Sequence, residues 1–155
     1  MAFKDSLTGL YNRAKCKRIF EVLNSSDSDY AIVSIDLNDL KKTNDTYGHT
    51  RGDDLIISFS KVFKNAFDGV GTTIRMGGDE FVAIVRSEHL DDLPDVLKKM
   101  EYLEEHVTDS LPVPLDAAYG CAIHKKGDSR RAQDVYNLAD IQMYQMKAES
   151  KKNRK

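Results

Sequence analysis

The sequence predicts an α+β fold (an α/β sandwich), in which helices flank a central antiparallel sheet of the ferredoxin-like or palm type. Apolar runs typical of strands alternate with amphipathic helical patterns in the order βααββαβ. This is the order of a split βαβ unit, whose first and third strands are antiparallel neighbours. The 155 residues, 41% hydrophobic and 31% charged, suit one globular domain with a substantial core.

Each element is predicted by its own periodicity. The expected helices are residues 14–23, 39–47, 53–67, 90–107 and 131–147. The expected strands are residues 30–35, 72–76, 81–85 and 115–124. The two central helices are separated by the glycine-containing segment 48–52, and the second of them carries a clear apolar stripe. The closing helix is expected to turn four apolar residues inward: Val135, Leu138, Ala139 and Met146.

Two glycines and two acids, Gly77-Gly78-Asp79-Glu80, lie between the second and third expected strands. The Gly-Gly pair favours a tight hairpin, because glycine adopts positive φ at little cost. A bare hairpin does not need two carboxylates, and here they point to opposite faces of the following strand. The glycines also let a charged ligand approach the backbone closely. This combination indicates a site for metal ions and phosphates.

Asp36 ends the first expected strand and Asp79 opens the third. Because these strands are antiparallel neighbours about 4.8 Å apart, the two carboxylates lie at the same end of the sheet. Such a pair suits Mg²⁺, which takes oxygen ligands and leaves positions for phosphates. Taken alone, Asp36 is better explained as a strand-end residue that caps the next turn. Its place opposite Asp79 favours the metal site.

Residues 77–81 resemble the signature of the GGDEF family, the diguanylate cyclases, and stand here unaltered. Further motifs follow in family order over residues 5–151. The resemblance implies a catalytic domain, related to those of nucleotide cyclases, that joins two GTP into cyclic dimeric GMP (c-di-GMP) and releases two pyrophosphates. The N-terminal motif of the family is expected to be structural; it comprises Asp5, Leu7, Thr8, Gly9, Asn12 and Arg13.

The resemblance also implies roles for the turn after the first strand and for the hairpin. Two Mg²⁺ or Mn²⁺ ions per active site are held by Asp36, the Leu37 carbonyl, Asp79 and Glu80, with Gly77 and Gly78 completing the catalytic hairpin. Glu80 acts either as a ligand or by polarising the attacking 3′-hydroxyl. Asn38 and Lys41 belong to the phosphate turn. Family members often carry a second Asp where Asn38 stands, and Lys41 is equally explained as a solvated surface lysine.

Two further groups of residues are assigned to GTP by the resemblance. Asn44 and Asp53 are expected to read guanine, since a carboxylate accepts from guanine N1–H and N2–H₂, and adenine offers no matching pair of donors. The alternative for Asp53 is a helix cap. Lys147 and Lys151 are expected to reach the β- and γ-phosphates. The alternative is that they complement the helix dipole, and Lys151 replaces the family's usual Arg without its bidentate geometry.

One departure concerns regulation. Many family members carry an Arg-x-x-Asp motif, which binds the product and inhibits, shortly before the Gly-Gly pair. Asp68 and Gly71 stand at those positions here. We therefore expect no inhibitory site.

Other properties restrict the setting and partners. A net charge of −2 argues against nucleic-acid binding, and no stretch resembles a membrane span or a signal peptide. Cys16 and Cys121 are isolated, which favours a reducing cytoplasm. We expect residues 1–155 to be a single domain cut from a larger signalling protein with an input domain, located in the cytoplasm or on the cytoplasmic side of a membrane anchor. Its expected partners are GTP and a second copy of the domain, in a transient homodimer.

Two rival functions remain open at this point. The first is a catalytically weak or inactive GTP-binding regulatory domain, against which the intact residues 77–81 and Asp36 argue. The second is a palm-fold cyclase that acts alone on one nucleotide, against which Asn44 and Asp53 argue.

Overall fold

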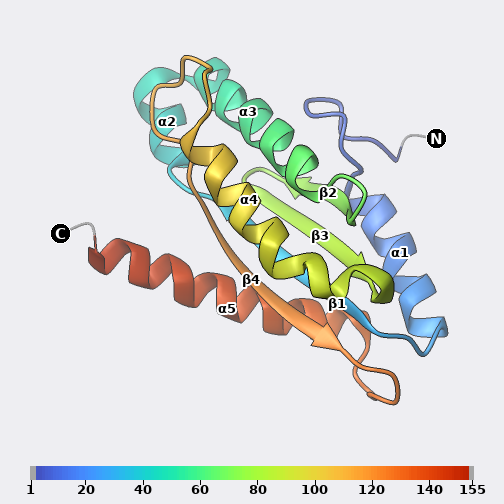
Figure 1. Cartoon of the computed structure of the whole chain (residues 1–155). Coiled ribbons are helices and arrows are strands. Elements are labelled where there is room, and N and C mark those ends of the chain that lie inside the picture. The colour runs from blue at the N-terminus through green and yellow to red at the C-terminus, as the bar shows by residue number, and fades with distance from the viewer. Residues whose placement is uncertain (1–2, 154–155) are drawn as a thin grey trace.

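The computed structural model describes residues 3–153, which form one four-stranded antiparallel sheet covered by helices on both faces (Figure 1). The helices are α1 (Arg13–Ser25), α2 (Leu40–Tyr47), α3 (His49–Phe67), α4 (Leu93–Glu105) and α5 (Ala132–Asn153), with a short 3₁₀ helix, η1 (Ser87–Asp92), before α4. The strands are β1 (Tyr30–Leu37), β2 (Gly71–Gly77), β3 (Glu80–Arg86) and β4 (Ala117–His124). The predicted α+β fold and its βααββαβ order are confirmed.

The strand order is β2-β3-β1-β4, so β1 lies between β3 and β4 at the centre of the sheet. Both of its pairings are antiparallel, and all eight of its residues are buried. A central strand covered on both faces reads as a continuous apolar run, which explains why it was recognisable from the sequence. The predicted pairing of the first and third strands is confirmed.

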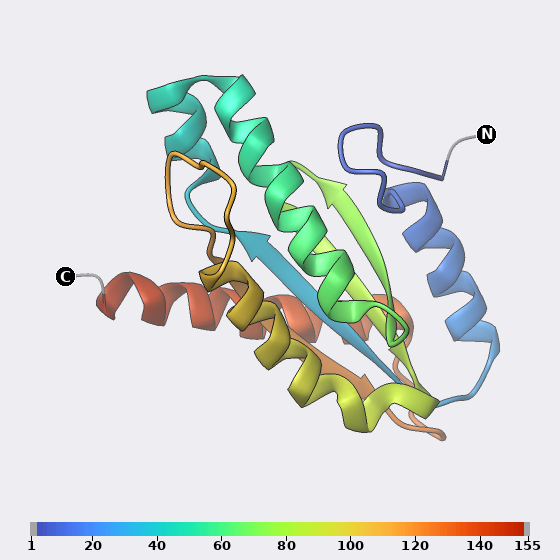
Figure 2. The same ribbon diagram turned by 45° about the horizontal axis from the view of Figure 1, so that its top comes forward.

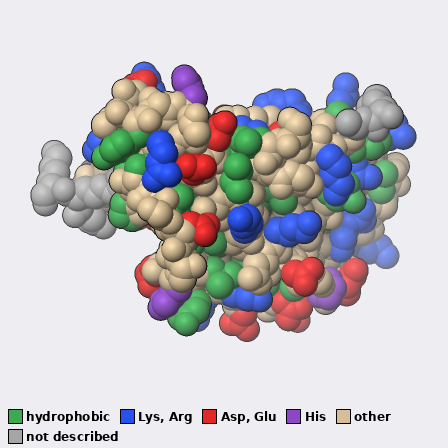
Figure 3. All heavy atoms as spheres, turned by 90° about the horizontal axis from the view of Figure 1, so that it is seen from above, with side chains coloured by type: hydrophobic (Ala, Val, Ile, Leu, Met, Phe, Trp, Pro, Cys, Tyr) green, Lys and Arg blue, Asp and Glu red, His purple; other side chains and the backbone are tan. Residues whose placement is uncertain are grey.

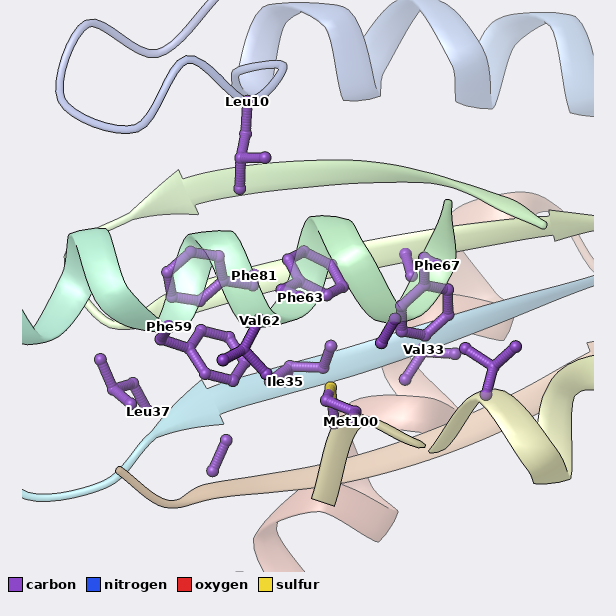
Figure 4. Packing of buried hydrophobic residues seen from close by; sticks show 14 of the residues in the cluster. Leu10, Val33, Ile35, Leu37, Phe59, Val62, Phe63, Phe67, Phe81 and Met100 are labelled. Carbon is purple, nitrogen blue, oxygen red and sulfur yellow. The ribbon is translucent and has the colours of Figure 1, made fainter. Parts of the chain in front are cut away.

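Two apolar clusters lie on the two faces of the sheet. Helices α3 and α4 cover one face, and α1 and α5 cover the other (Figure 2). On the first face, Phe59, Phe63 and Phe67 of α3 recur at four-residue spacing (Figure 4). Phe59 and Phe63 pack against Phe81 of β3, and Phe67 packs against Phe63. This stripe fixes α3 along the sheet, and with it the turn that precedes the helix.

The structure differs from the prediction in two helix boundaries and in the placement of one side chain, besides shifts of a few residues at other element ends. Helix α3 begins at His49, directly after Gly48, so the expected separator 48–52 is mostly helical. The helix expected at 90–107 divides into η1 and α4 at Leu93, with Pro94 in the first turn of α4. In α5, Leu138 does not face the core as expected but is 41% exposed.

The two outer strands have occupied edges. Backbone N–H groups of β4 at Tyr119 and Cys121 donate to Met146 Sδ and Gln142 Oε1 of α5. On the other side, the Arg75 N–H of β2 donates to the Tyr11 carbonyl, which lies in the segment before α1. Gly120 lets α5 approach closely, because a Cβ there would lie 2.3 Å from the Ala139 carbonyl oxygen.

Within residues 3–153, none of the helices has both the length and the apolar character needed to cross a membrane.

Candidate active site

Two carboxylates meet where β1 ends and the β2–β3 hairpin turns. Asp36 lies opposite Glu80 in the register of β1 and β3, and the N–H of the next residue, Leu37, donates to the Asp79 carbonyl at 2.8 Å. Asp36 is buried, Asp79 is half-buried and Glu80 is exposed. The register of two neighbouring strands therefore brings together residues that are 43 positions apart (79 − 36).

The carboxylate of Asp36 forms an ion pair with a lysine of α5. Lys147 Nζ lies 2.6 Å from Asp36 Oδ2. Burial raises the pKa of Asp36 to about 6; the Lys147 ammonium lowers it and the Asp79 carboxylate raises it. The second oxygen, Asp36 Oδ1, is buried and has no hydrogen-bond partner. Leaving a buried acceptor without a donor is costly, so this oxygen suits a cationic ligand.

The residues present fit a divalent metal ion supplied together with a phosphate ligand. The orphaned Asp36 Oδ1 and the adjacent Asp79 offer hard oxygen donors of the kind that Mg²⁺ prefers. Within residues 3–153 no three His, Cys, Asp or Glu side chains are placed to hold a metal by themselves. An ion here would complete its coordination with phosphate oxygens and water, as Mg²⁺ commonly does.

A cleft of about 450 Å³ opens beside the two acids. It is bounded by the turn after β1, the first half of α2, the hairpin acid and the end of α5. Its lining residues are Leu37, Asn38, Asp39, Leu40, Lys41, Lys42, Asp45, Thr46, Asp79, Lys147, Ser150 and Lys151. Four of these residues are lysines, and α2 begins at the cleft. Both features favour an anionic ligand.

The turn into α2 has an unusual backbone conformation. Asp39 has φ 67°, in the left-handed region, and is the only residue other than glycine with positive φ in residues 3–153. The carbonyl of Asp39 accepts from both the N–H and the hydroxyl of Thr43, at 2.9 and 2.7 Å. This turn starts α2 at Leu40 directly at the cleft, so that the free N–H groups of its first turn lie at the site.

Six of the predicted site residues line this cleft: Leu37, Asn38, Lys41, Asp79, Lys147 and Lys151. Asp36 adjoins it through Lys147. The side-chain amide of Asn38 donates to Asp116 Oδ2, a residue that the sequence analysis did not consider. Only the pairing register of β1 with β4 could have pointed to Asp116, and that register is not readable from local pattern.

Asn44 and Asp53 lie on the neighbouring helices α2 and α3, outside the residues that line the cleft. Gly52 allows this helix pair to pack closely, because a Cβ at Gly52 would collide with Asn44 Oδ1 at 1.7 Å. Asp53 is exposed, in the second turn of α3. Since Gly48 is the N-cap of α3, the helix-cap alternative for Asp53 is wrong.

The Gly-Gly hairpin is held in place by an arginine that precedes it. Gly77 and Gly78 both have positive φ, 139° and 51°. Arg75 donates to the Gly78 carbonyl from Nε and Nη2, at 3.2 and 3.1 Å, and its Nη1 lies 3.1 Å from the Asp5 carboxylate. Asp5 in turn accepts from the N–H and hydroxyl of Thr8. The N-terminal motif therefore supports the hairpin, and the function of Arg75 was missed in the sequence.

The two positions discussed for product inhibition lie at the junction of α3 and β2. Asp68 is the C-cap of α3, and Gly71 is the first residue of β2. A Cβ at Gly71 would lie 3.0 Å from the Ile84 carbonyl oxygen, so this backbone leaves little room for a larger residue. The lack of an inhibitory site remains a prediction.

Comparison with known proteins gives a consistent match. The family profile described as "Diguanylate cyclase, GGDEF domain" matches residues 2–153. The probable diguanylate cyclase DgcJ of Escherichia coli is 28% identical over 145 residues, covering 90% of this chain and 28% of DgcJ. The diguanylate cyclase DgcS of Shewanella oneidensis is 28% identical and covers 95% of this chain and 50% of its own length. The chain thus spans half or less of these two relatives.

Among solved structures, the GGDEF domain of DgcB from Caulobacter crescentus, in complex with c-di-GMP, superposes with a TM-score of 0.83 at 23% identity. The match covers 96% of this chain and 91% of that one. At this level of identity the likeness shows a shared fold.

Proposed function

The chain belongs to the GGDEF family of diguanylate cyclase domains, and we propose that it joins two GTP molecules into c-di-GMP with release of two pyrophosphates. The observation that carries this proposal is the meeting of Asp36 and Asp79 beside a lysine-lined cleft at the start of α2. This arrangement offers oxygen donors for metal ions and positive groups for a triphosphate in one place.

The reaction forms one new ester bond per GTP. The 3′-hydroxyl oxygen of one GTP attacks the α-phosphorus of the other, the bond from that phosphorus to the bridging oxygen breaks, and pyrophosphate leaves with the electron pair. The hydroxyl proton is lost in this step, and the second GTP repeats it in the opposite sense to close the ring. Catalysis of such displacements depends mainly on positioning and on stabilising charge.

The triphosphate would lie along the turn of residues 37–41. Amides at the start of α2 and the ammonium groups of Lys41, Lys147 and Lys151 supply its positive partners. Lys147 would then exchange part of its contact with Asp36 for a phosphate oxygen. The side chain of Asn44 and the exposed carboxylate of Asp53 would receive guanine at the α2–α3 pair, next to the cleft.

The metal ions would be held by Asp36, Asp79 and Glu80 together with the Leu37 carbonyl. When bound there, Mg²⁺ or Mn²⁺ would supply positive charge that makes the attacking hydroxyl more acidic and offsets the charge of the departing pyrophosphate. The chain's own contribution is to keep Asp36 in place through its contact with Lys147 and Asp79 in place through the hairpin that Arg75 holds.

Two copies of the domain have to meet, because one site holds one GTP and the product contains two. A two-fold arrangement with the hairpins opposed places each hydroxyl against the other nucleotide. On the face shown in Figure 3, hydrophobic side chains are scattered among charged ones of both signs. We propose a transient homodimer, a cytoplasmic location, and activation in the full-length protein by a domain that raises the local concentration of copies.

Incubation with GTP and Mg²⁺ or Mn²⁺, followed by chromatography of the products, tests the proposal. We expect c-di-GMP and pyrophosphate in a ratio of one to two, with a rate that rises with the square of protein concentration when copies are dilute. Fusion of a parallel dimeric coiled coil before Asp5 raises the effective concentration to the order of millimolar and should increase turnover strongly. A cyclic mononucleotide, or GTP binding without turnover even in the fused dimer, would refute the proposal.

A further inference from the structure

Asn38 is held twice by one residue from a distant part of the chain. Its N–H donates to the Asp116 carbonyl oxygen at 2.9 Å, and its side-chain Nδ2 donates to Asp116 Oδ2, also at 2.9 Å. The last regular pair of β1 and β4 is Leu37 with Ala117, so the backbone bond extends the ladder by one residue beyond the strands. Asn38 is buried and Asp116 is half-buried, so the side-chain bond is partly shielded from water.

This contact lies where the chain leaves the sheet for the phosphate turn. On the opposite side of β1, the Leu37 N–H donates to the Asp79 carbonyl. Directly after Asn38 comes Asp39 with φ 67°, a conformation that is unfavourable for a residue with a side chain. Such a backbone persists only where neighbouring contacts impose it. Thr43 holds the turn from its far side through the Asp39 carbonyl, and Asp116 holds it from the near side.

We propose that Asp116 is a positioning residue for GTP: through Asn38 it holds the turn of residues 37–41 in the shape that receives the triphosphate. This inference rests on the proposed function of the cleft. Asp116 does not itself line the cleft, whereas Asn38 and the next three residues do. Its effect on the nucleotide therefore passes through the turn.

The side-chain hydrogen bond between Asn38 and Asp116 has a defined direction, from donor to acceptor. An amide at 38 supplies the donor and a carboxylate at 116 the acceptor. An aspartate at 38 would place two acceptors face to face, and their like charges would repel in a buried setting. An asparagine at 116 would then restore a donor and an acceptor with the polarity reversed. A change of side chain at residue 38 therefore needs a complementary change at residue 116.

The test compares Asp116→Ala, Asn38→Asp and the double variant Asn38→Asp/Asp116→Asn with the parent protein. Binding of GTP is measured by calorimetry with Mg²⁺ and a non-hydrolysable α,β-methylene analogue, and thermal unfolding is measured in parallel. Asp109→Ala is the matched control, because Asp109 lies in the same loop and its carboxylate accepts from Ser58 of α3 rather than from the turn.

We expect Asp116→Ala and Asn38→Asp to weaken analogue binding by about tenfold or more, the loss typical of a charge-assisted hydrogen bond. The double variant should recover most of that affinity. Amide exchange at Thr43, whose N–H donates to the Asp39 carbonyl, should be faster in the two single variants and slow again in the double one. Asp109→Ala should lower the melting temperature and leave the affinity unchanged.

Three results distinguish the possible failures. Affinity within twofold of the parent in Asp116→Ala, with a lowered melting temperature, would make Asp116 a purely structural residue. A double variant no better than Asn38→Asp would overturn the pairing. A parent protein that does not bind the analogue at all would refute the proposed function and not the placement of the turn, which amide exchange reports independently.

Discussion

Acidic and basic side chains lie at both ends of β1, but their hydrogen bonding is complete at one end and incomplete at the other. At the Tyr30 end, His124 contacts the carbonyl oxygens of Ser28 and Asp128 through its two ring nitrogens, at 2.8 and 3.0 Å, and stacks on Tyr30. The guanidinium of Arg130 binds the Asp128 side chain and holds the pKa of that carboxyl down to about 2. Each of these groups has a partner supplied by the chain.

At the Leu37 end the same strand leaves polar groups incompletely paired. Asp36 has one buried oxygen without a partner, and burial raises its pKa to about 6. Native structures bond nearly all of their buried polar groups, so an exception calls for an explanation. The Tyr30 end uses its polar groups to close loops onto the sheet. The Leu37 end keeps acceptor capacity for a ligand, and this difference supports the proposed active site at that end.

The sharpest test of this contrast exchanges one carboxylate for an amide at each end. Asp79→Asn should lower turnover of GTP by about 10²–10³-fold, because an amide does not supply the charge needed at the reacting phosphates. The melting temperature should stay near that of the parent. The measurement is c-di-GMP formation at micromolar protein. Asp36→Asn should behave in the same way.

Asp128→Asn is the matched change at the Tyr30 end and should lower the melting temperature while turnover is kept. Near-parental turnover in Asp79→Asn, or a loss of turnover in Asp128→Asn, would break the assignment of function to one end.

A second prediction asks whether the functional region extends from the cleft to the α2–α3 pair. Asp53→Ala should weaken GTP binding by about 10–100-fold and leave ATP binding unchanged, because guanine has the donor pair N1–H and N2–H₂ for the proposed contact and adenine has no matching pair. Calorimetry with both nucleotides measures the difference. Asp54→Ala is the control, since Asp54 is adjacent and already pairs with Arg51 at 2.8 Å. Equal losses in both variants would mean a general effect of charge, and no loss in either would remove Asp53 from the site.

The third prediction concerns the well-paired end alone. His124→Leu leaves the carbonyl oxygens of Ser28 and Asp128 without their ring partners, which should cost about 1–3 kcal/mol in the free energy of unfolding. Urea unfolding measures this loss. Turnover per folded molecule should stay unchanged below the transition. A change in the Michaelis constant for GTP would show that the two ends are coupled along β1.

The smallest expected effect belongs to an unpaired acid outside the cleft. Glu104 of α4 has a buried Oε1 without a partner, and burial raises its pKa to about 8, with Asp116, Glu101 and Glu105 adding to the shift. Between about pH 5 and 8 the unfolded chain ionises this group while the folded protein keeps it protonated, so stability falls as pH rises through this window.

Glu104→Gln removes that dependence because an amide does not titrate. It should be more stable than the parent by about 1–2 kcal/mol at pH 7 and no more stable near pH 4.5, as measured by urea unfolding across the range. Product formation should be unaltered. A variant that lost turnover would show that unpaired acids mark function on this side of the sheet as well, and a difference independent of pH would contradict the protonation of Glu104.

Much of the fold is predictable from this sequence because local pattern and tertiary placement agree. The apolar run of β1 is buried on both faces, and the phenylalanine stripe of α3 packs on the sheet as its spacing requires. The meeting of Asp36 and Asp79 also follows from topology alone, since the register of β1 and β3 places them together. The start of α3 was predicted too late because a tertiary contact at a glycine decided it. Helix α3 passes through Gly52 because that glycine accommodates Asn44, a tertiary reason that overrides glycine's low helix propensity.

The remaining parts of the site depend on contacts between distant segments. Asp116 meets Asn38 only after β4 has paired with β1, and Arg75 meets Asp5 only after β2 has formed. Neither Asp116 nor Arg75 stands out in its own sequence neighbourhood. The exposure of Leu138 also depends on a contact between distant segments, because α5 packs against Gly120 of β4 at the neighbouring residue Ala139, which is fully buried.

The occupied strand edges have a consequence for behaviour at high concentration. Open sheets tend to extend edge to edge with other copies of themselves, and natural proteins block this by engaging or covering outer N–H groups. Here side chains of α5 accept from β4, and the segment before α1 accepts from β2. A domain whose proposed reaction needs frequent encounters between copies is exposed to that hazard at each encounter. Engaged N–H groups at both edges disfavour edge-to-edge pairing of copies, which is compatible with the proposed meeting of two copies at the hairpin face.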